Sequence, residues 1–435
     1  MAFAAILVIG IGAAWDRLPG YDDRRSLDPA NLRAGFGPAN YAAARTRAES
    51  NLVGARETYA YAPDEWLRGE VLARALIARW RLSGDYADLA EADRVLDRGL
   101  AQTPDPAGPV LSRALLSVLL HRLDQADVAL ARAARAVVPD PAETADAAAL
   151  RGDVAVQRGR LDQAHLDFEG ARGIDKSTGI GLRGAMLAAY RGDRNQAAHA
   201  IEALLARPRQ QPAVLAELML QRANIAYWGG EWDEAGRWVG AAQRIFPGYW
   251  LADVYAAQQF AIAGRTQDAI RAYAIVARRT GRPEVQDALA HLLRLQGQGA
   301  ESRAWAAKAA AGWDSRARLF PEAVIHHQAE HELVVGSASR ALPFAQADAA
   351  QRPQAPNLVL LARALLSAGR PGEALAALDR ADAQGWVSAG QQLARAEVLA
   401  ALGRTSDSEA ARAKAQAINP RAADPRTRLI WFGHD

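Results

Sequence analysis

The chain has 435 residues, of which 50% are hydrophobic and 23% are charged, and its mean hydropathy is −0.16. This balance excludes an intrinsically disordered chain and a membrane protein with many spans. Fifty-two basic residues stand against 49 acidic ones, so the formal charge is only +3 and no basic excess indicates nucleic-acid binding. Because cysteine is absent, a disulfide framework, a thiolate metal site and a cysteine nucleophile are excluded as well.

The chain starts with a short apolar run. Apolar or small residues fill positions 2–14, ahead of Trp15 and a charged, proline-containing stretch. The run is shorter than the ~20 residues that span a bilayer, but it fits the apolar region of a secretory signal. No basic residue precedes it. We therefore expect residues 1–15 to be a signal peptide or a short membrane anchor, with a buried N-terminal helix or strand as the alternative.

A pattern of small residues recurs along the chain. A turn glycine is followed five positions later by a small residue, as in Gly230 with Ala235, and His121 takes the glycine place in one unit. Another small residue stands seven positions before each turn, and neighbouring units are 33–39 residues apart. Each unit is typical of two helices joined by a short turn, with small side chains where the helices cross. Since one such unit cannot bury its apolar face alone, the units must stack into one solenoid instead of three globular domains.

This repeat resembles the tetratricopeptide family, whose unit of about 34 residues has the same small residues, turn glycine and terminal proline. The agreement is closest in the unit with Ala223, Tyr227, Gly230, Trp232, Ala235, Ala242 and Pro247. The resemblance implies an all-α fold, a right-handed α-solenoid of about ten helix–turn–helix repeats over residues 64–422. Residues 16–63 are expected to form a linker and an N-terminal capping helix, and residues 423–435 a C-terminal tail without the repeat.

The resemblance also implies a function, because arrays of this family are usually non-catalytic scaffolds that bind a peptide segment or partner protein in a concave groove. In the family, the residue after the first small position points into the groove. Carried over to this chain, that register and its neighbours give ten candidate groove residues: Asp153, Asn224, Tyr227, Gln258, His291, Arg294, His326, Glu330, Arg363 and Glu397. Solvation of an ordinary exposed face explains the same polarity and is the alternative. We expect no catalytic residue, no metal and no cofactor.

One residue of this register suggests a specific ligand. Asn224 matches an asparagine with which chaperone-binding members of the family hold a terminal carboxylate. Leu220 and Glu284, however, stand at the places where that mode requires positive charge. Recognition of an acidic C-terminus is therefore not expected, and an internal or mixed-charge segment fits better.

A different motif suggests an enzyme. His327, Glu330 and His331 match the H-x-x-E-H signature of zinc peptidases, in which two histidines share a helix face and the glutamate activates zinc-bound water. The repeat already explains a helix at this place, and the sequence nominates no third ligand. A zinc-dependent peptidase is thus one alternative to the scaffold, and a cytosolic module that senses a peptide or ligand is another.

Composition and the N-terminus together predict where in the cell the protein acts. Arginine and alanine are abundant while lysine occurs only three times, which is typical of a high-GC bacterium. With the apolar N-terminus, this predicts a periplasmic protein, or one tethered to the membrane and facing the periplasm, in cell-envelope assembly or export. A cytoplasmic location is the alternative. The expected partner is another protein or a peptide segment, not nucleic acid, and the sequence does not give the oligomeric state.

Overall fold

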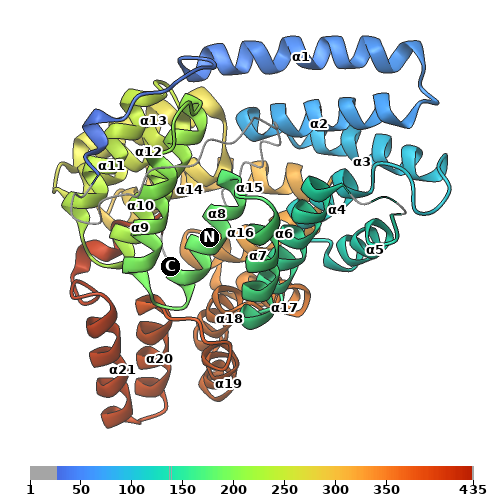
Figure 1. Ribbon diagram of the computed structural model, residues 1–435. Helices are drawn as coiled ribbons and strands as arrows, with labels where there is room; N and C mark the ends of the chain where they lie inside the picture. The colour runs from blue at the N-terminus through green and yellow to red at the C-terminus, as the bar shows by residue number, and fades with distance from the viewer. Residues whose placement is uncertain (1–26, 137, 139, 434–435) are drawn as a thin grey trace.

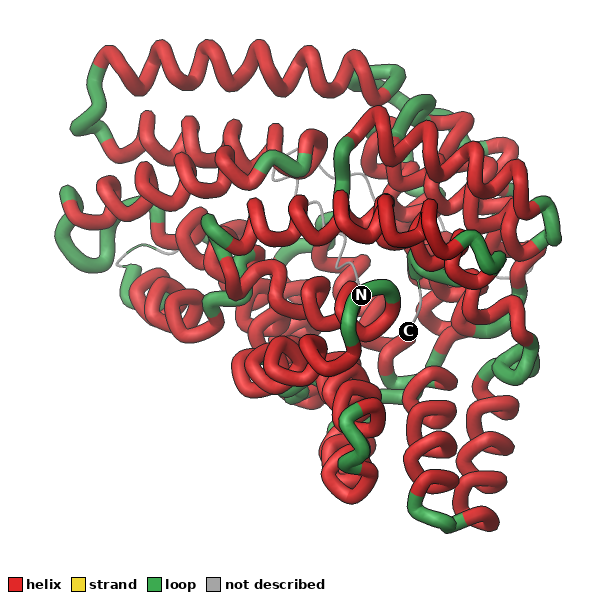
Figure 2. The backbone as a smooth tube through the Cα atoms, turned by 180° about the vertical axis from the view of Figure 1, so that it is seen from behind, coloured by secondary structure: helices red, strands yellow, loops and turns green. Residues whose placement is uncertain are grey.

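The computed structural model describes residues 27–136, 138 and 140–433, so the predicted signal or anchor at residues 1–15 lies outside the described residues. The described chain consists of α-helices, two short 3-10 helices and loops, without a strand (Figures 1 and 2). In chain order the elements are η1 (Pro29–Asn31), α1 (Tyr41–Tyr61), α2 (Trp66–Ser83), α3 (Tyr86–Ala101), α4 (Val110–Leu119), α5 (Leu123–Ala133), α6 (Pro141–Gln157), α7 (Leu161–Ile174), α8 (Thr178–Tyr190), α9 (Arg194–Leu205), α10 (Pro212–Trp228), α11 (Trp232–Ile245), α12 (Trp250–Ile262), α13 (Thr266–Thr280), α14 (Pro283–Leu295), α15 (Gly299–Ala317), α16 (Pro321–Val334), α17 (Ala338–Gln351), α18 (Ala355–Ser367), α19 (Pro371–Asp382), α20 (Ala389–Ala401), α21 (Thr405–Ile418) and η2 (Pro425–Leu429).

The helices pair as ten consecutive hairpins within the described residues, from α2 with α3 through to α20 with α21. Each hairpin also packs on the next one, and α1 packs on α2 at the start of the stack. The all-α array of about ten helix–turn–helix units that the repeat predicts is therefore confirmed. The helix α1 lies within residues 16–63, for which a linker and a capping helix are the expectation. None of the described helices combines the length and hydropathy that crossing a bilayer requires.

The small residues of the repeat lie where the two helices of a hairpin touch. Ala223 on α10 and Ala235 on α11 are both fully buried, and side chains of this size let the two helix axes approach closely. Gly230, in the turn between them, has a φ of 76°, a conformation that glycine adopts without strain. His121 has a φ of 62°, so it does take the glycine place in its own hairpin.

The array curls until its first hairpins pack against later ones. Leu72 and Leu76 on α2 belong to the same buried cluster as Trp313 on α15 and Val324 on α16. Because these residues are more than 200 positions apart, local helix pairing alone does not bring them together. The first repeats therefore close the array by packing against α15 and α16.

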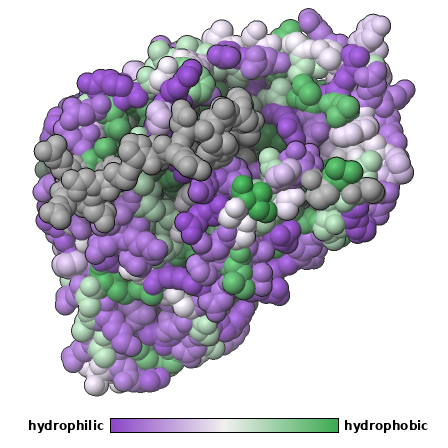
Figure 3. All heavy atoms as spheres, viewed as in Figure 1, coloured by the Kyte–Doolittle hydropathy of each residue, from purple (hydrophilic) through white to green (hydrophobic). Residues whose placement is uncertain are grey.

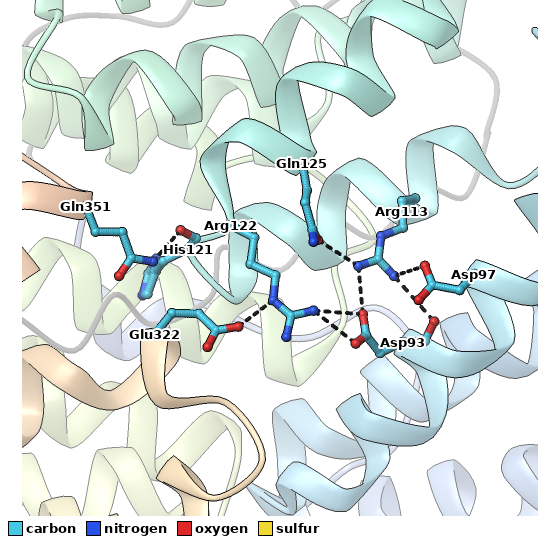
Figure 4. Close-up of polar contacts among 8 residues, drawn as sticks. All are labelled: Asp93, Asp97, Arg113, His121, Arg122, Gln125, Glu322 and Gln351. Carbon is cyan, nitrogen blue, oxygen red and sulfur yellow. Dashed lines mark hydrogen bonds and ion pairs between the residues drawn. The ribbon is translucent and has the colours of Figure 1, made fainter.

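Charged groups tie the same two parts of the chain together (Figure 4). Arg122, at the turn between α4 and α5, forms ion pairs with Asp93 on α3 at 3.0 Å and with Glu322 on α16. The side-chain amide of Gln351 on α17 donates to the carbonyl of His121 at 2.8 Å. These contacts fix the distance between early and late hairpins.

The last hairpins pack against the middle of the array. Tyr190 at the end of α8 stacks on Trp386, with ring centroids 4.1 Å apart and an interplanar angle of 16°. The backbone N–H of Val387 donates to the Tyr190 carbonyl at 2.8 Å. On the face shown in Figure 3, hydrophilic residues cover most of the surface and apolar residues form small separate groups. Most apolar side chains are buried between helices, as a stacked array requires.

Candidate functional site

Three polar side chains occupy the same repeat position on α10, α12 and α14, and we call them the inner site: Asn224, Gln258 and His291. Asn224 is 8% exposed and Gln258 is fully buried. Solvation of an exposed face therefore does not explain their polarity. Buried amides need hydrogen-bond partners, and in this row the partners include main-chain atoms of the chain's own C-terminal tail.

The inner site holds part of the chain's own C-terminal tail, residues 428–433, which we call the tail segment. The Oε1 atom of Gln258 accepts hydrogen bonds from the backbone N–H groups of Trp431 and Phe432, both at 2.8 Å. Its Nε2 atom donates to the Phe432 carbonyl at 3.0 Å. Two successive N–H groups that converge on one oxygen belong to a turn, so the bound segment is not fully extended.

Two further contacts hold the main chain of the tail segment. The Nε2 atom of His291 lies 2.8 Å from the carbonyl oxygen of Arg428. At the other end, the indole N–H of Trp228 donates to the Gly433 carbonyl at 2.8 Å. The inner site and Trp228 thus bind backbone atoms from one end of the tail segment to the other.

An aromatic pocket receives one side chain of the tail segment. Phe432 is 3% exposed, and its ring centroid lies 5.9 Å from that of Tyr255 on α12 and 6.5 Å from that of Tyr273 on α13. The Tyr255 hydroxyl donates to Oδ1 of Asn224 at 2.7 Å. Burial raises the pKa of Tyr255 well above its ordinary value, so this phenol stays a neutral donor. Asn224 therefore positions the pocket wall.

The tail segment borders a cavity of about 240 Å³ inside the closed array. Arg81, at the end of α2, faces this cavity, and its Nε and Nη2 atoms are buried without a hydrogen-bond partner among the described residues. Burial lowers the pKa of Arg81 to about 10, which leaves it protonated at neutral pH. The cavity wall combines early, middle and late helices, as its lining shows: Trp80, Tyr86, Met186, Glu217, Trp250 and Glu330.

Comparisons with known proteins concern the fold. No protein-family model matches the chain, and no curated protein matches it. Among solved structures, the APC/C hetero-tetramer Cut9–Hcn1 matches with a TM-score of 0.40 and 17% identity, over 83% of this chain and 76% of that chain. Yeast Tom70 matches with a TM-score of 0.40 and 14% identity, over 85% and 87%. A tetratricopeptide repeat protein from Parabacteroides merdae matches with a TM-score of 0.35 and 15% identity, over 56% and 94%.

The ten stacked hairpins carry the tetratricopeptide pattern of small residues and turn glycines. The chain has a tetratricopeptide-like fold. In this tetratricopeptide-like array, the inner site lies on the first helices of three consecutive hairpins, which is where the resemblance places a binding surface.

Two of the other candidate groove residues are buried in the array and bonded there. Tyr227 is 2% exposed, and its hydroxyl accepts a hydrogen bond from the side chain of Gln259 at 2.8 Å. His326 is 8% exposed, and its Nδ1 atom lies 2.7 Å from Oδ2 of Asp348. Burial lowers the pKa of His326 to about 4. The centroid of the Tyr227 ring lies 6.0 Å from that of Tyr255 and supports the aromatic pocket, whereas His326 is bound within its own hairpin, α16 with α17.

The remaining candidates lie elsewhere in the array. Asp153 forms an ion pair with Arg183 at 2.7 Å. Arg294 is exposed on α14, and Arg363 and Glu397 are exposed on α18 and α20. None of these four candidates is among the described residues that line the cavity. For Arg363 and Glu397, ordinary solvation accounts for the polarity.

Chaperone-binding members of the family hold a terminal carboxylate with positive charge, in what we call a carboxylate clamp. The charge near α14 differs from this. Glu284, at a place where such a clamp requires positive charge, lies 2.8 Å from Arg316 and 3.8 Å from Arg282. Burial raises the pKa of Glu284, but the two guanidinium charges outweigh it and hold the pKa at about 2. The Glu284 charge is therefore balanced by its own neighbours.

The H-x-x-E-H motif lies on α16. Glu330 and His327 both line the cavity, and His327 stacks on Trp313 with ring centroids 4.8 Å apart. The Nδ1 atom of His331 lies 2.6 Å from Oδ1 of Asp287. In the part of the chain that the structure describes, no three histidine, aspartate or glutamate side chains are placed to hold a metal ion. This arrangement gives no support to the zinc peptidase.

Proposed function

We propose that the protein is a protein-interaction scaffold whose inner site binds a short segment of a partner protein. The observation that supports this most is the environment of Gln258, a fully buried amide on α12 that binds two backbone N–H groups and one carbonyl. An amide that binds backbone atoms holds a peptide without depending on most of its side chains. Gln258 therefore suits a surface that takes a segment of another protein.

The groups around the site favour binding over catalysis. Amide and phenol groups donate and accept hydrogen bonds, and buried aromatic rings contribute apolar contact. Arg81 adds a positive charge at the cavity beside the tail segment. A role in cell-envelope assembly or export, in the periplasm or tethered to the membrane, is part of the proposal. It rests on the apolar residues 1–15 and the composition alone, and a cytoplasmic location is the alternative.

Selection of random dodecapeptides on the immobilised protein tests the proposed function. The bait is the full chain with Trp431→Ala and Phe432→Ala, in which the tail segment is loosened. We expect enriched peptides that bind at least ~10-fold more weakly when Gln258→Leu is added, because their backbone atoms lose the amide. The matched control adds Arg363→Ala and Glu397→Ala, which change the same repeat position on α18 and α20, where it is exposed, and should leave binding unchanged. Peptides that are lost with the control pair and retained with Gln258→Leu would place the binding surface elsewhere.

A further inference from the structure

The inner site and the aromatic pocket contact three features of the tail segment. Gln258 binds the N–H groups of two consecutive residues, and the aromatic pocket encloses the Phe432 ring. The third feature is Gly433, whose φ is 72°. A Cβ atom at Gly433 would overlap Oδ1 of Asn224 and lie 2.9 Å from the Tyr255 hydroxyl oxygen. A segment that fits this surface must therefore carry an aromatic residue followed directly by glycine.

The contacts of the inner site with the tail do not involve the charged side chains of Arg426 and Arg428. Arg426 forms an ion pair with Asp424 of the same tail at 2.6 Å. Arg428 contacts His291 through its carbonyl oxygen. A segment from another chain needs no basic side chain to make the backbone contacts of the tail segment.

The tail segment can leave without breaking a hairpin. It follows α21, which ends at Ile418, and belongs to none of the ten helix pairs. Among residues 425–433, Phe432 alone is buried, whereas Ile430 and Trp431 are half-buried. Release of the tail segment therefore exposes one buried ring and frees the bonds of Gln258, while the stacked helices keep their contacts.

We infer that the tail segment is a resident occupant of the inner site and that the partner segment replaces it. The partner is a protein segment in which an aromatic residue is followed directly by glycine. This inference rests on the proposed function, because it names the partner chemistry of the same site. Since the tail is tethered, it acts at an effective concentration of ~mM, so a free segment binds weakly until the tail is loosened.

A labelled peptide tests this inference. The probe is a fluorescein-labelled synthetic peptide with the sequence of residues 425–433, and its matched control has alanine at the Phe432 place. The probe should bind the full chain with Trp431→Ala and Phe432→Ala at least ~10-fold more tightly than it binds the parent chain, by fluorescence anisotropy. The control peptide should bind that variant at least ~10-fold more weakly than the probe does. Circular dichroism melts of both proteins check that the helices are intact.

Gly433→Ala provides a second loosened chain, which keeps the aromatic residues and every residue of the inner site. The added Cβ atom would overlap Oδ1 of Asn224, and a φ of 72° strains alanine. The probe, which keeps the glycine, should therefore bind the Gly433→Ala chain at least ~10-fold more tightly than it binds the parent chain. Gly403→Ala is the matched control, because Gly403 has a φ of 74° and no atom within 4 Å of its Cβ position, and this variant should bind the probe as weakly as the parent does.

The outcomes separate this inference from the proposed function. Equal binding of the probe to the parent chain and to both loosened chains would overturn the resident-occupant inference. If the loosened chain is folded but does not bind the probe, the partner segment is not one in which an aromatic residue is followed by glycine. Either result leaves the proposed function standing if the selection still yields peptides that depend on Gln258.

Discussion

Replacement of Trp313 by alanine is expected to lower the free energy of unfolding by about 3–5 kcal/mol. Trp313 on α15 is 2% exposed and belongs to the cluster that joins the first hairpins to the later ones. Its indole N–H also donates to Oδ2 of Asp287 at 2.7 Å. The substitution thus leaves a cavity at the closure of the array and removes a donor from a buried carboxylate. Urea unfolding followed by circular dichroism measures the change.

Trp313→Phe is the matched control for this prediction. It keeps a buried aromatic ring but loses the indole donor and part of the apolar surface, so the expected loss is smaller, about 1–2 kcal/mol. If the alanine variant lost less than about 1 kcal/mol, the early and late hairpins would not pack around Trp313 as described.

Substitution of Asp348 by asparagine should cost about 3–5 kcal/mol, because it leaves a buried positive charge without its counter-ion. Asp348 on α17 is 1% exposed and binds Arg352, itself 3% exposed, through Nε at 3.0 Å. Its other oxygen lies 2.7 Å from Nδ1 of His326 on α16. Asparagine keeps the size of the side chain, so the loss reports the charge. Urea unfolding at pH 7 measures it.

The pH dependence of the Asp348→Asn effect gives a further check. Burial raises the pKa of Asp348, but His326 and Arg352 outweigh it and hold the pKa at about 2. An aspartate in the unfolded chain has a pKa of ~3.9, so the charge of Asp348 stabilises the fold above that value, and this contribution is lost as the pH falls toward 2. The gap between parent and variant should narrow over this range.

An exposed aspartate serves as the control for Asp348. Asp379 pairs with Arg395 at 2.8 Å, but its side chain is 62% exposed. Asp379→Asn should change the free energy of unfolding by less than about 1 kcal/mol. A loss at Asp348 no larger than the loss at Asp379 would contradict the buried charge network.

Much of the fold follows from the spacing of small residues. Ala223, Ala235 and Gly230 mark a hairpin in the sequence because close helix crossing and a left-handed turn each restrict the residue type. Even His121 is placed correctly by its register, although its residue type is unusual for that conformation. Such constraints act over a few positions, so they are visible in one sequence.

The closure of the array does not follow from the spacing. Arg122 and Glu322 are 200 positions apart, and their contact depends on small rotations that accumulate over every hairpin between them. No local pattern marks either residue. For the same reason Arg81 lies outside the groove register, and only closure brings the end of α2 to the cavity.

The site was predictable in part. The register selects Asn224, Gln258 and His291, which the structure places together, but it also selects Arg363 and Glu397, which are exposed. The tail segment has no repeat pattern, so nothing in Trp431 or Phe432 indicates that they fill the inner site. The available signal is a short apolar run, Leu429 to Phe432, directly before a glycine in a tail that carries no repeat pattern.

Amide hydrogen exchange at Trp431 and Phe432 tests most directly whether the inner site binds a peptide main chain. Both N–H groups are bonded to Oε1 of Gln258, so in the parent protein they should exchange much more slowly than in a free peptide of the same sequence. In the Gln258→Leu variant they should exchange at the free-peptide rate while the helices of α10 to α14 stay protected. Free-peptide exchange at both amides in the parent protein would contradict the binding of the tail segment by the inner site.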